Sequence, residues 1–594
     1  MILGILSNSR LPLWLRLYLI VAIRHPGSAI AIAYWYVTKR RVRAANRLNQ
    51  SVHPLIPAYL AWTMTVEHNE DSTFFSSAAA RPIHFTIIVN AKRQSAAMLG
   101  RLLASISGQK HEDWDVILVG DNRPVDLGFN PNVRVQFVAS TEPDDVEAYY
   151  RAIQMAAGAY LVLVPDGAIL PRRALARYAE AAQTFANPTV LYGDEDRLDE
   201  TGMRSDPWFK PQWNEELLLA TDYISRACAI STKAAQTVPV LPKRISACAG
   251  YALVLGLARL PGFTACHLPH VLCHLAQDAA RSAILAQCLA VAYWRGIDGV
   301  KASAGPFGTV VAAWPMPLNE PSVEIIIPTR DKLDLLAACV NSILAKTRYD
   351  NYRIMIIDNN SIEKRTLKWL GEISTNPRVS VLSYPEHYNY SAINNFGISQ
   401  SLSRFVCLLN NDTEVISHDW LSELVRYAVQ DDVGAVGAKL LYKDGHIQHA
   451  GVAIGLGNAA GHSHRGLNDS SPGYFAVPHC AHSVSAVTAA CLLVSREKYI
   501  SVGGLDDINL QIAYNDVDFC LKLQAKGWRN IYAPRAVLYH YESKSRGNDF
   551  SPNHLERYLS ELSVLQSRWD TQTIVDPMHH VRLDRSSETY RLHI

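Results

Sequence analysis

In the second half of the chain, one apolar segment changes abruptly into polar residues and marks a candidate site of chemistry. The run Phe405–Leu409 is followed by Asn410, Asn411, Asp412 and, after one threonine, Glu414. A continuous apolar run is typical of a parallel strand that is buried on both faces. In an open α/β sheet the chemistry collects beyond the carboxyl ends of the strands. We therefore expect these polar side chains at the rim of a site, where oxygen ligands suit a hard divalent cation.

An ordinary polar turn is the alternative interpretation of this segment, because Asn, Asp and Thr are frequent turn formers. Other parts of the same half favour a site. Two further apolar runs end in polar or acidic residues, and an acid-rich segment and a late histidine follow them. The side chains concerned are Pro328, Thr329, Arg330, Asp358, Asp516 and His540.

The elements that would position these residues form a pattern that occurs twice. The first half has predicted strands and helices at 84–89, 96–106, 115–119, 146–157 and 159–164. The second half has them, in the same order, at 323–327, 333–344, 352–357, 391–401 and 405–409. Alternating strands and helices indicate βαβ units with mainly parallel sheets, and the recurrence is an internal repeat. The sequence therefore predicts an α/β fold with two tandem domains.

Size and composition agree with this division and restrict the function. The chain has 594 residues, too many for one hydrophobic core. Its formal net charge of +2 argues against a dedicated nucleic-acid binder. The ten cysteines are scattered without a C-x-x-C pair, which favours reduced thiols in a cytoplasmic protein over disulfides or a zinc site.

We divide the chain into five parts, of which the first is an N-terminal helical segment. The ranges are 1–50 for this segment, 82–278 for a first domain, 279–320 for a proline-containing linker, 321–570 for a second domain and 571–594 for a tail. The apolar stretch 11–37 is broken at Arg24-His25-Pro26-Gly27, so neither piece is long enough to span a bilayer. Aromatic residues beside the basic run 39–43 favour peripheral contact with the inner face of the cell membrane. A helical hairpin packed on the protein is the alternative.

Several motifs of the second domain resemble the family 2 glycosyltransferases of the GT-A fold, which is Rossmann-like. The resemblance extends from Pro321 to Trp569 and is nearest to rhamnosyltransferase-like enzymes of bacterial surface polysaccharide (O-antigen) assembly. The motifs are Ile325-Ile-Ile-Pro-Thr-Arg-Asp331, Ile356-Ile-Asp-Asn-Asn-Ser361, Leu408-Leu-Asn-Asn-Asp-Thr-Glu414 and Tyr514-Asn-Asp-Val-Asp-Phe519. The resemblance implies a nucleotide-diphosphate sugar donor, a divalent cation (Mg²⁺ or Mn²⁺) and a saccharide or lipid-linked saccharide acceptor.

The resemblance also assigns roles to individual residues. Asp516 matches the general base, which would take the proton of the acceptor hydroxyl. Asp412, with His540, would hold the cation, because the first position of the family's metal motif is Asn here. Donor binding is expected from Pro328, Thr329, Arg330, Asp358, Asn410, Asn411 and Asp412. One base opposite a metal-bound leaving group implies inversion at the anomeric carbon. Asp518 is the alternative base, although a helix-capping role is as good an interpretation for it.

The first domain resembles the same family in a degenerate form. Its metal motif is reduced to Asp166, and Gly250-Tyr251-Ala252 stands where active relatives have the acids of the base motif. Asp121, Asp194 and Asp196 remain and could still bind a nucleotide or a sugar. We interpret this domain as a pseudoenzyme that packs against the active one.

Two other functions compete with glycosyl transfer. A nucleotidyltransferase would need a glycine-rich, basic loop after its first strand to hold a triphosphate, and the segments 90–93 and 328–331 contain no glycine. A non-catalytic scaffold or glycan-binding subunit suits the first domain but not the acids of the second.

Overall fold

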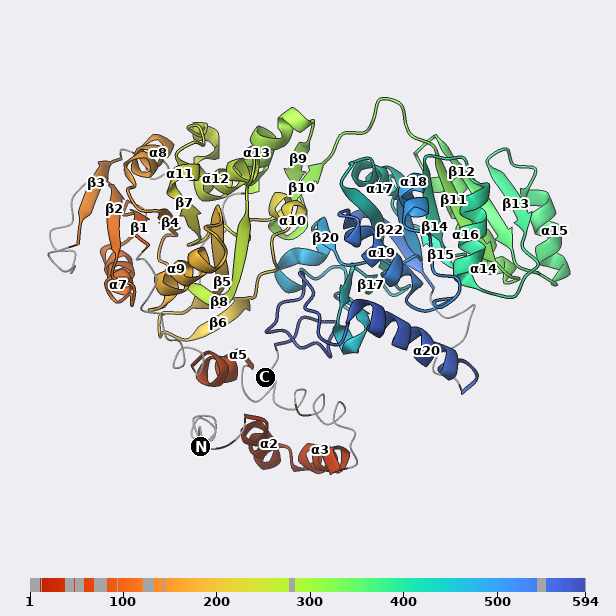
Figure 1. Cartoon of the computed structure of the whole chain (residues 1–594), viewed down its shortest axis with the longest axis horizontal. Helices are drawn as coiled ribbons and strands as arrows, with labels where there is room; N and C mark the ends of the chain where they lie inside the picture. Colours follow the sequence, from red (N-terminus) through yellow and green to blue (C-terminus); the bar gives the residue numbers. More distant parts are fainter. Residues whose placement is uncertain are drawn as a thin grey trace.

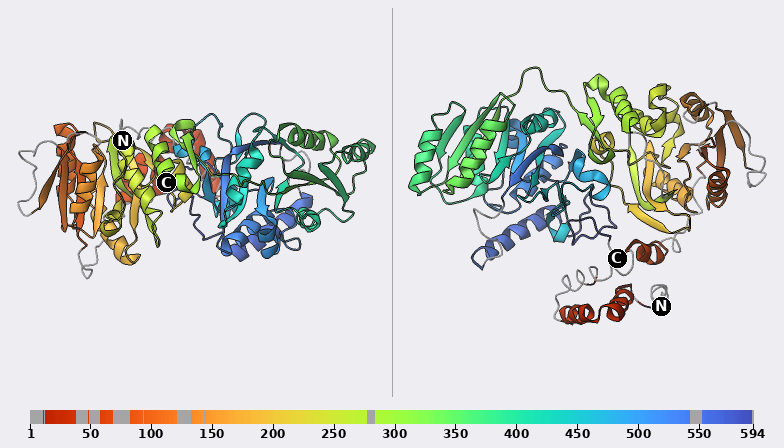
Figure 2. Two further views of the ribbon diagram at one scale, coloured as in Figure 1. Left: turned by 90° about the horizontal axis from the view of Figure 1, so that it is seen from above. Right: turned by 180° about the vertical axis from the view of Figure 1, so that it is seen from behind.

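Two α/β units lie side by side in the computed structural model, with the N-terminal helices beneath the first (Figure 1). Seen from above, the two units form one elongated body (Figure 2). The structure describes residues 11, 13–37, 48, 58–68, 83–92, 94–120, 133–140, 142, 145–276, 284–541 and 552–592. Asp121 and the basic run 39–43 lie outside the described residues.

The first unit contains a sheet in the strand order β3-β2-β1-β4-β7-β5-β6, with β8 beside β5. The first four strands in this order run parallel, and β7 is antiparallel to both of its neighbours. The strands are β1 (Phe85–Asn90), β2 (Trp114–Gly120), β3 (Val135–Ala139), β4 (Tyr160–Val164), β5 (Val190–Leu198), β6 (Arg204–Trp208), β7 (Ala229–Ser231) and β8 (Ala265–Ala276). Helices near the sheet include α7 (Ala96–Ser107), α8 (Val146–Met155), α9 (Ala174–Thr184), α10 (Glu215–Ala220) and α12 (Ala249–Leu257).

The second unit repeats this arrangement in the order β13-β12-β11-β14-β21-β16-β22-β15. Again four parallel strands are followed by an antiparallel one, here β21. The strands are β11 (Val323–Thr329), β12 (Tyr352–Asp358), β13 (Val379–Ser383), β14 (Phe405–Leu409), β15 (Thr413–Val415), β16 (Val433–Leu441), β21 (Cys491–Ser495) and β22 (Arg529–His540). The helices include α14 (Leu333–Lys346), α16 (Tyr390–Gln400), α17 (Trp420–Ala428), α19 (Asn515–Ala525) and α20 (Pro552–Trp569).

The predicted fold class and internal repeat are confirmed. All predicted strands and helices of both halves are present within a few residues of their expected ends, and β14 has the expected bounds Phe405–Leu409. The sheets are mainly parallel, as predicted, although β7 and β21 insert in the opposite direction. Apolar patterning shows that a segment is buried but not which way it runs.

The range predicted as a linker is largely folded. Residues 284–313 form helix α13 (Ile284–Arg295) and the antiparallel hairpin of β9 (Lys301–Ala304) and β10 (Val310–Ala313). Ala290, Val291, Val300 and Val310 are buried in the core of the first unit. The prolines of this range therefore do not indicate an unstructured linker. The domain boundaries themselves stay predictions.

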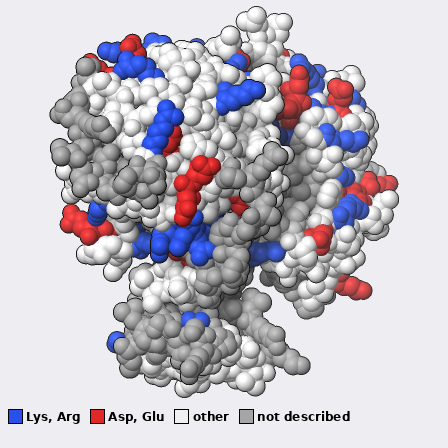
Figure 3. All heavy atoms as spheres, turned by 60° about the vertical axis from the view of Figure 1, so that its left-hand side comes forward, with Lys and Arg blue, Asp and Glu red and all other residues white. Residues whose placement is uncertain are grey.

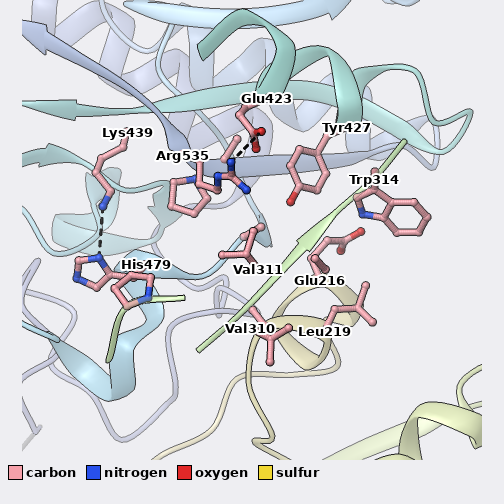
Figure 4. A pocket seen from close by; sticks show the side chains of 16 residues that line it. Glu216, Leu219, Val310, Val311, Trp314, Glu423, Tyr427, Lys439, His479 and Arg535 are labelled. Atoms are coloured by element: carbon pink, nitrogen blue, oxygen red, sulfur yellow. Dashed lines mark hydrogen bonds and ion pairs between the residues drawn. The ribbon is translucent and has the colours of Figure 1, made fainter. Parts of the chain in front are cut away.

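The two units pack directly against each other, as expected for a degenerate domain beside an active one. Asn214, the N-cap of α10, donates from Nδ2 to the Ser483 carbonyl at 2.9 Å and accepts from the Ser483 backbone N–H at 3.1 Å. Glu216 of α10 forms a partly buried ion pair with Arg529 of β22. A pocket of about 80 Å³ lies at this junction. Figure 4 shows side chains of α10, β10, α17 and β22 around it, among them Glu216, Val310, Tyr427 and Arg535.

The N-terminal segment is a pair of short helices followed by a short helical stretch that contacts the first unit. Helices α2 (Leu13–Arg24) and α3 (Pro26–Val37) contact each other through Trp14 and Tyr36, whose rings stack with centroids 5.6 Å apart. Within the described residues, the helices are all too short or too polar to cross a membrane. The next stretch consists of α5 (Ala58–Trp62) and η1 (Thr63–Glu67), and Tyr59 donates to Asp196 of β5 at 2.6 Å.

Candidate active site

A pocket of about 430 Å³ opens at the carboxyl ends of β11 and β14. Six of the residues predicted to bind the donor line it together: Pro328, Thr329, Arg330, Asn410, Asn411 and Asp412. Parallel strands place their carboxyl ends at one edge of a sheet, and β11 pairs with β14 in parallel. The two polar segments are about 80 residues apart in the sequence and meet for this reason.

Hydrogen bonds fix the polar floor of this pocket. Asn411 donates from Nδ2 to the Thr329 hydroxyl at 3.0 Å, which ties the end of β14 to the end of β11. The Tyr390 hydroxyl, at the start of α16, donates to Asn410 Oδ1 at 3.1 Å. Both asparagines are thus held in place by neighbours, which favours an organised binding surface.

Asp412 lines the pocket and faces His540, which is not itself among the lining residues. Antiparallel pairing of β15 with β22 places Thr413 opposite His540 and so brings the histidine beside Asp412. His540 Nδ1 lies 2.7 Å from Gln448 Oε1. Because a carboxamide oxygen only accepts, Nδ1 carries a proton and donates it. In the neutral imidazole, Nε2 then presents a lone pair to Asp412 Oδ1 at a separation of 3.2 Å.

Two electron-rich atoms in this position suit a shared cation. Asn410 Nδ2 lies 3.3 Å from His540 Nε2 and can donate to it, in agreement with a lone pair on Nε2. Two ligands of one octahedral Mg²⁺ at about 2.1 Å from the ion are about 3 Å apart. Metal-binding histidines commonly donate their other ring N–H to a neighbouring polar group that fixes the orientation of the ring. Gln448 would have this role for His540. The residues predicted to hold the cation therefore fit it.

Asp358 ends β12 next to this pocket but is not among the residues that line it. It is paired in the sheet register with Thr329, and its Oδ1 accepts from the Ser361 backbone N–H at 3.2 Å. Its half-buried carboxylate therefore lies at the same sheet edge as the donor-binding residues.

Asp516 occupies the first turn of α19, where a carboxylate is favoured by the helix dipole. Its Oδ2 accepts from the Ala489 backbone N–H at 3.1 Å. The Ala489 carbonyl in turn accepts from the Tyr390 hydroxyl, the same group that binds Asn410. Asp516 is thus connected to the pocket floor through two intervening residues, and its half-buried side chain keeps partial access to solvent.

Asp518 has a different, structural environment. Its side chain is fully buried and accepts from Arg568 at 2.8 Å and from the Trp569 indole N–H at 2.9 Å. Since α19 begins at Asn515, Asp518 is not the cap of a later helix, as the alternative interpretation had it. Its contacts instead anchor the end of α20 to the domain.

Several lining residues of the pocket, and the place of Glu414, were not predicted. The additional lining residues are Asp331, Lys332, Glu363, Tyr388, Tyr390, Ile393, Ile512 and Arg557. Arg557 comes from α20 and ion-pairs with Glu561 one turn later, and no local motif marked this helix as part of a site. Glu414 does not line the pocket, because it accepts from the Tyr541 hydroxyl at 2.7 Å and lies 3.6 Å from Lys346.

The acids of β5 in the first unit are enclosed by basic partners. Asp194 Oδ1 lies 2.8 Å from His267 Nε2, and its Oδ2 lies 3.0 Å from His580 Nε2 of the tail. Burial raises the pKa of the Asp194 carboxyl, but the two histidines outweigh it and hold the pKa below its ordinary value. Asp194 and Asp196 are each 1% exposed and paired with basic side chains, which argues against the predicted binding of a nucleotide or a sugar by these two acids.

The next two carboxylates of β5 are paired in the same way. Glu195 contacts Lys210 at 2.9 Å and also pairs with Arg226. Burial raises the pKa of the Glu195 carboxyl, and the two cations reverse this effect and lower the pKa to about 2. Asp196 lies 2.6 Å from His274 and accepts from Tyr59. These acids hold the first unit together.

The ligand atoms of Asp194, His267 and His580 lie within 4.8 Å of one another, a grouping that could hold a metal ion. The hydrogen bonding of His580 argues against this role. Its Nδ1 accepts from the Arg582 backbone N–H at 3.0 Å, so a neutral His580 carries its proton on Nε2. The protonated Nε2 lies 3.0 Å from Asp194 Oδ2 and has no lone pair to offer a metal ion. The group is better described as a buried clasp between the first unit and the tail.

The fold and the pocket define an α/β unit with polar and acidic residues at its sheet edge, and comparisons with known proteins refine this class. Residues 324–485 match the family model described as Glycosyl transferase family 2. The match lies within the second unit and confirms the resemblance drawn from its motifs. Its α/β sheet agrees with the GT-A fold that was predicted.

Relatives extend the similarity over both units. The chain is 36% identical over 525 residues to uncharacterized protein y4gI of Sinorhizobium fredii, covering 84% of this chain and 57% of the relative. It is 32% identical over 523 residues to O-antigen biosynthesis protein RfbC of Myxococcus xanthus, covering 84% of this chain and 40% of the relative. A third match, 31% over 80 residues, is to N-acetylglucosaminyl-diphospho-decaprenol L-rhamnosyltransferase of Mycobacterium tuberculosis, with coverages of 13% and 26%. The chain thus spans about half the length of the longer relatives.

Proposed function

We propose that the second unit transfers a sugar from a nucleotide-diphosphate donor, with inversion, to a hydroxyl of a growing cell-surface glycan or lipid-linked saccharide. Rhamnose is the sugar we propose first, because relatives are named for rhamnosyl transfer and O-antigen biosynthesis. The observation that carries the proposal is the pocket in which the ends of β11 and β14 meet beside Asp412 and His540.

Each group has a distinct part in this proposal. Pro328, Thr329, Arg330 and the two asparagines bind the donor at the pocket, and Asp358 binds its nucleotide. Asp412 and His540 hold a divalent cation, which when bound would neutralise the charge that develops on the leaving diphosphate. Asp516 orients the acceptor hydroxyl and takes its proton as the hydroxyl attacks the anomeric carbon.

The first unit is proposed to be a pseudoenzyme that shapes the acceptor path. Its β5 carboxylates are occupied by His267, His274, Lys210 and other basic side chains. The protein is further proposed to work on the cytoplasmic side of the cell membrane, in peripheral contact with it. All ten cysteines are free thiols, and nine of them are buried, in keeping with a reducing compartment.

Donor hydrolysis tests the proposal against its alternatives. A panel of nucleotide sugars is first screened with Mn²⁺ for thermal stabilisation, because a ligand that binds only the folded state raises its stability. The stabilising donor is then incubated with the enzyme and the products are identified. Release of the nucleoside diphosphate supports a glycosyltransferase. Release of pyrophosphate would indicate a nucleotidyltransferase, and no turnover with any donor or acceptor extract would favour a scaffold.

A further inference from the structure

A second pocket, of about 630 Å³, lies in the first unit at its contact with the N-terminal segment. One wall comes from the end of α7 and the segment that leads into α9, and another from Trp62 and Glu67 of α5 and η1. Asn90, Lys92 and Asp166, at the ends of β1 and β4, are not among its lining residues. The pocket is therefore separate from the degenerate counterpart of the active site.

This pocket is strongly basic. The cations that line it are Lys110, Arg172, Arg173, Arg177 and Arg204. Among the described lining residues Glu67 is the single acid, and it is bound by Arg204. Figure 3 shows Lys and Arg side chains gathered in a band where the body of the first unit meets the N-terminal segment.

The cations lie at different depths, as in a site that receives an anion from outside. Lys110 and Arg172 are exposed, Arg173 is half-buried, and Arg177 is 8% exposed and contacts His270 at 3.0 Å. Burial lowers the pKa of His270, and Arg177 and another arginine lower it further, to about 3. Burial accounts for the largest part of this shift, and the part due to Arg177 shows that the inner end of the pocket is positively charged.

The N-terminal helices indicate where such an anion would come from. Large apolar side chains of α2 and α3 are exposed, including Ile30 at 71%, Tyr34 at 59% and Val37 at 79%. Exposed apolar and aromatic side chains on short helices are typical of segments that lie in the membrane interface. Since α5 and η1 join this segment to the first unit and form a wall of the basic pocket, a bilayer in contact with α2 and α3 would present its phosphate groups nearby.

We propose that this basic pocket binds the phosphate headgroup of an anionic lipid and so docks the first unit on the membrane. The pseudoenzyme unit would then have a function of its own, the positioning of the active unit at the bilayer surface. The proposal extends the proposed membrane contact and does not depend on glycosyl transfer, because its readout is binding.

The test is co-sedimentation of the full-length protein with three kinds of vesicle. They consist of phosphatidylcholine alone, phosphatidylcholine with phosphatidic acid, and phosphatidylcholine with oleate at the same surface charge. The wild type should prefer phosphatidic acid over oleate, since oleate offers charge without phosphate. In the double variant Lys110→Glu/Arg172→Glu this preference should disappear, and affinity for phosphatidic acid vesicles should fall about thirtyfold, at roughly fivefold per basic side chain.

A matched control distinguishes an effect of the pocket on vesicle binding from an effect of net charge. Lys243→Glu/Arg244→Glu makes the same charge change at exposed positions of the same unit, outside the pocket, and should keep the preference. All three proteins should have the same thermal midpoint and the same donor hydrolysis, so that loss of docking is distinguished from loss of fold or of transfer. No preference in the wild type, or an undiminished preference in the pocket variant, would overturn the proposal. Pocket-dependent stabilisation by inorganic pyrophosphate without vesicle binding would also overturn it, in favour of a soluble phosphate compound.

Discussion

The two units have the same sheet order but use their acids in opposite ways. In the second unit, Asp412 follows β14 and lies at the base of a pocket of about 430 Å³, next to His540 and two asparagines. In the first unit, the carboxylates of β5 are buried, and each contacts at least two basic or hydroxyl partners. A shared fold therefore does not carry the chemistry: Asp412 lines a pocket beside two uncharged asparagines, whereas the β5 acids are already paired with basic side chains.

The difference also explains how the first unit accommodates its buried acids. A buried charge is costly unless it is paired and hydrogen-bonded. The first unit satisfies its β5 acids with partners from three sources: its own residues such as Arg204 of β6, the N-terminal stretch through Tyr59, and the tail through His580. The acids of β5 thus connect the first unit to the N-terminal stretch and to the tail.

The largest expected effect concerns the base of the active unit. Asp516→Asn keeps the shape of the side chain but cannot accept a proton at neutral pH, so turnover with the acceptor should fall about 10²–10⁴-fold. Donor affinity, measured by titration, should remain, because Asp358 and the cation site are unchanged. Near-normal turnover would remove Asp516 as the base. Since Asp518 is held by Arg568 and Trp569, a base from another element would then have to be sought.

A variant of the inactive unit should lose stability and keep activity. Asp194→Ala leaves His267 and His580 without their buried carboxylate, and breaking a buried pair of this kind costs about 3–5 kcal/mol of unfolding free energy. Denaturant unfolding measures the loss, and donor hydrolysis by the protein that remains folded should be unchanged. Asp350→Ala, whose side chain is 93% exposed, is the control and should change stability by less than about 0.5 kcal/mol. A similar stability for both variants would show that the clasp contributes little.

A smaller effect, on metal affinity, is expected from a substitution of Gln448 in the second unit. Gln448→Leu removes the acceptor that orients His540, and the loss of such a supporting hydrogen bond typically costs about 10–100-fold in metal affinity. The apparent Mn²⁺ constant of turnover should rise while the rate at saturating Mn²⁺ stays close to that of the wild type. If the rate falls at saturating metal and the constant is unchanged, His540 does not act through a cation.

The smallest effect is a change in acid sensitivity. The folded pKa of Glu195 is about 2, below the ordinary value of about 4.3. A lowered pKa means that Glu195 contributes stability above pH 4.3 that is lost as the pH falls toward 2. The slope of unfolding free energy against pH in this window should therefore be shallower in Glu195→Gln. An identical slope in the variant would show that other groups dominate acid unfolding.

Much of the fold and of the active pocket could be predicted from the sequence, because apolar runs that end in polar residues identify buried strands and their carboxyl ends. Pro328–Arg330 and Asn410–Asp412 were expected together and line one pocket. No sequence pattern of this kind predicted the contacts between distant segments. Arg557 enters the pocket from a late helix, and His580 reaches Asp194 across 386 residues. Nothing local in Tyr192-Gly-Asp-Glu-Asp196 reveals that its acids are already paired.

The central claim is that metal-dependent chemistry belongs to the second unit alone. The most direct measurement compares Mn²⁺-dependent release of nucleoside diphosphate by Asp412→Ala and Asp166→Ala, two acids at corresponding strand ends, with folding verified for both. Asp412→Ala should have no metal-dependent turnover, because the carboxylate opposite His540 is gone. Asp166→Ala should retain wild-type turnover. Comparable loss in the two folded variants would contradict the account and would make the first unit a second active site.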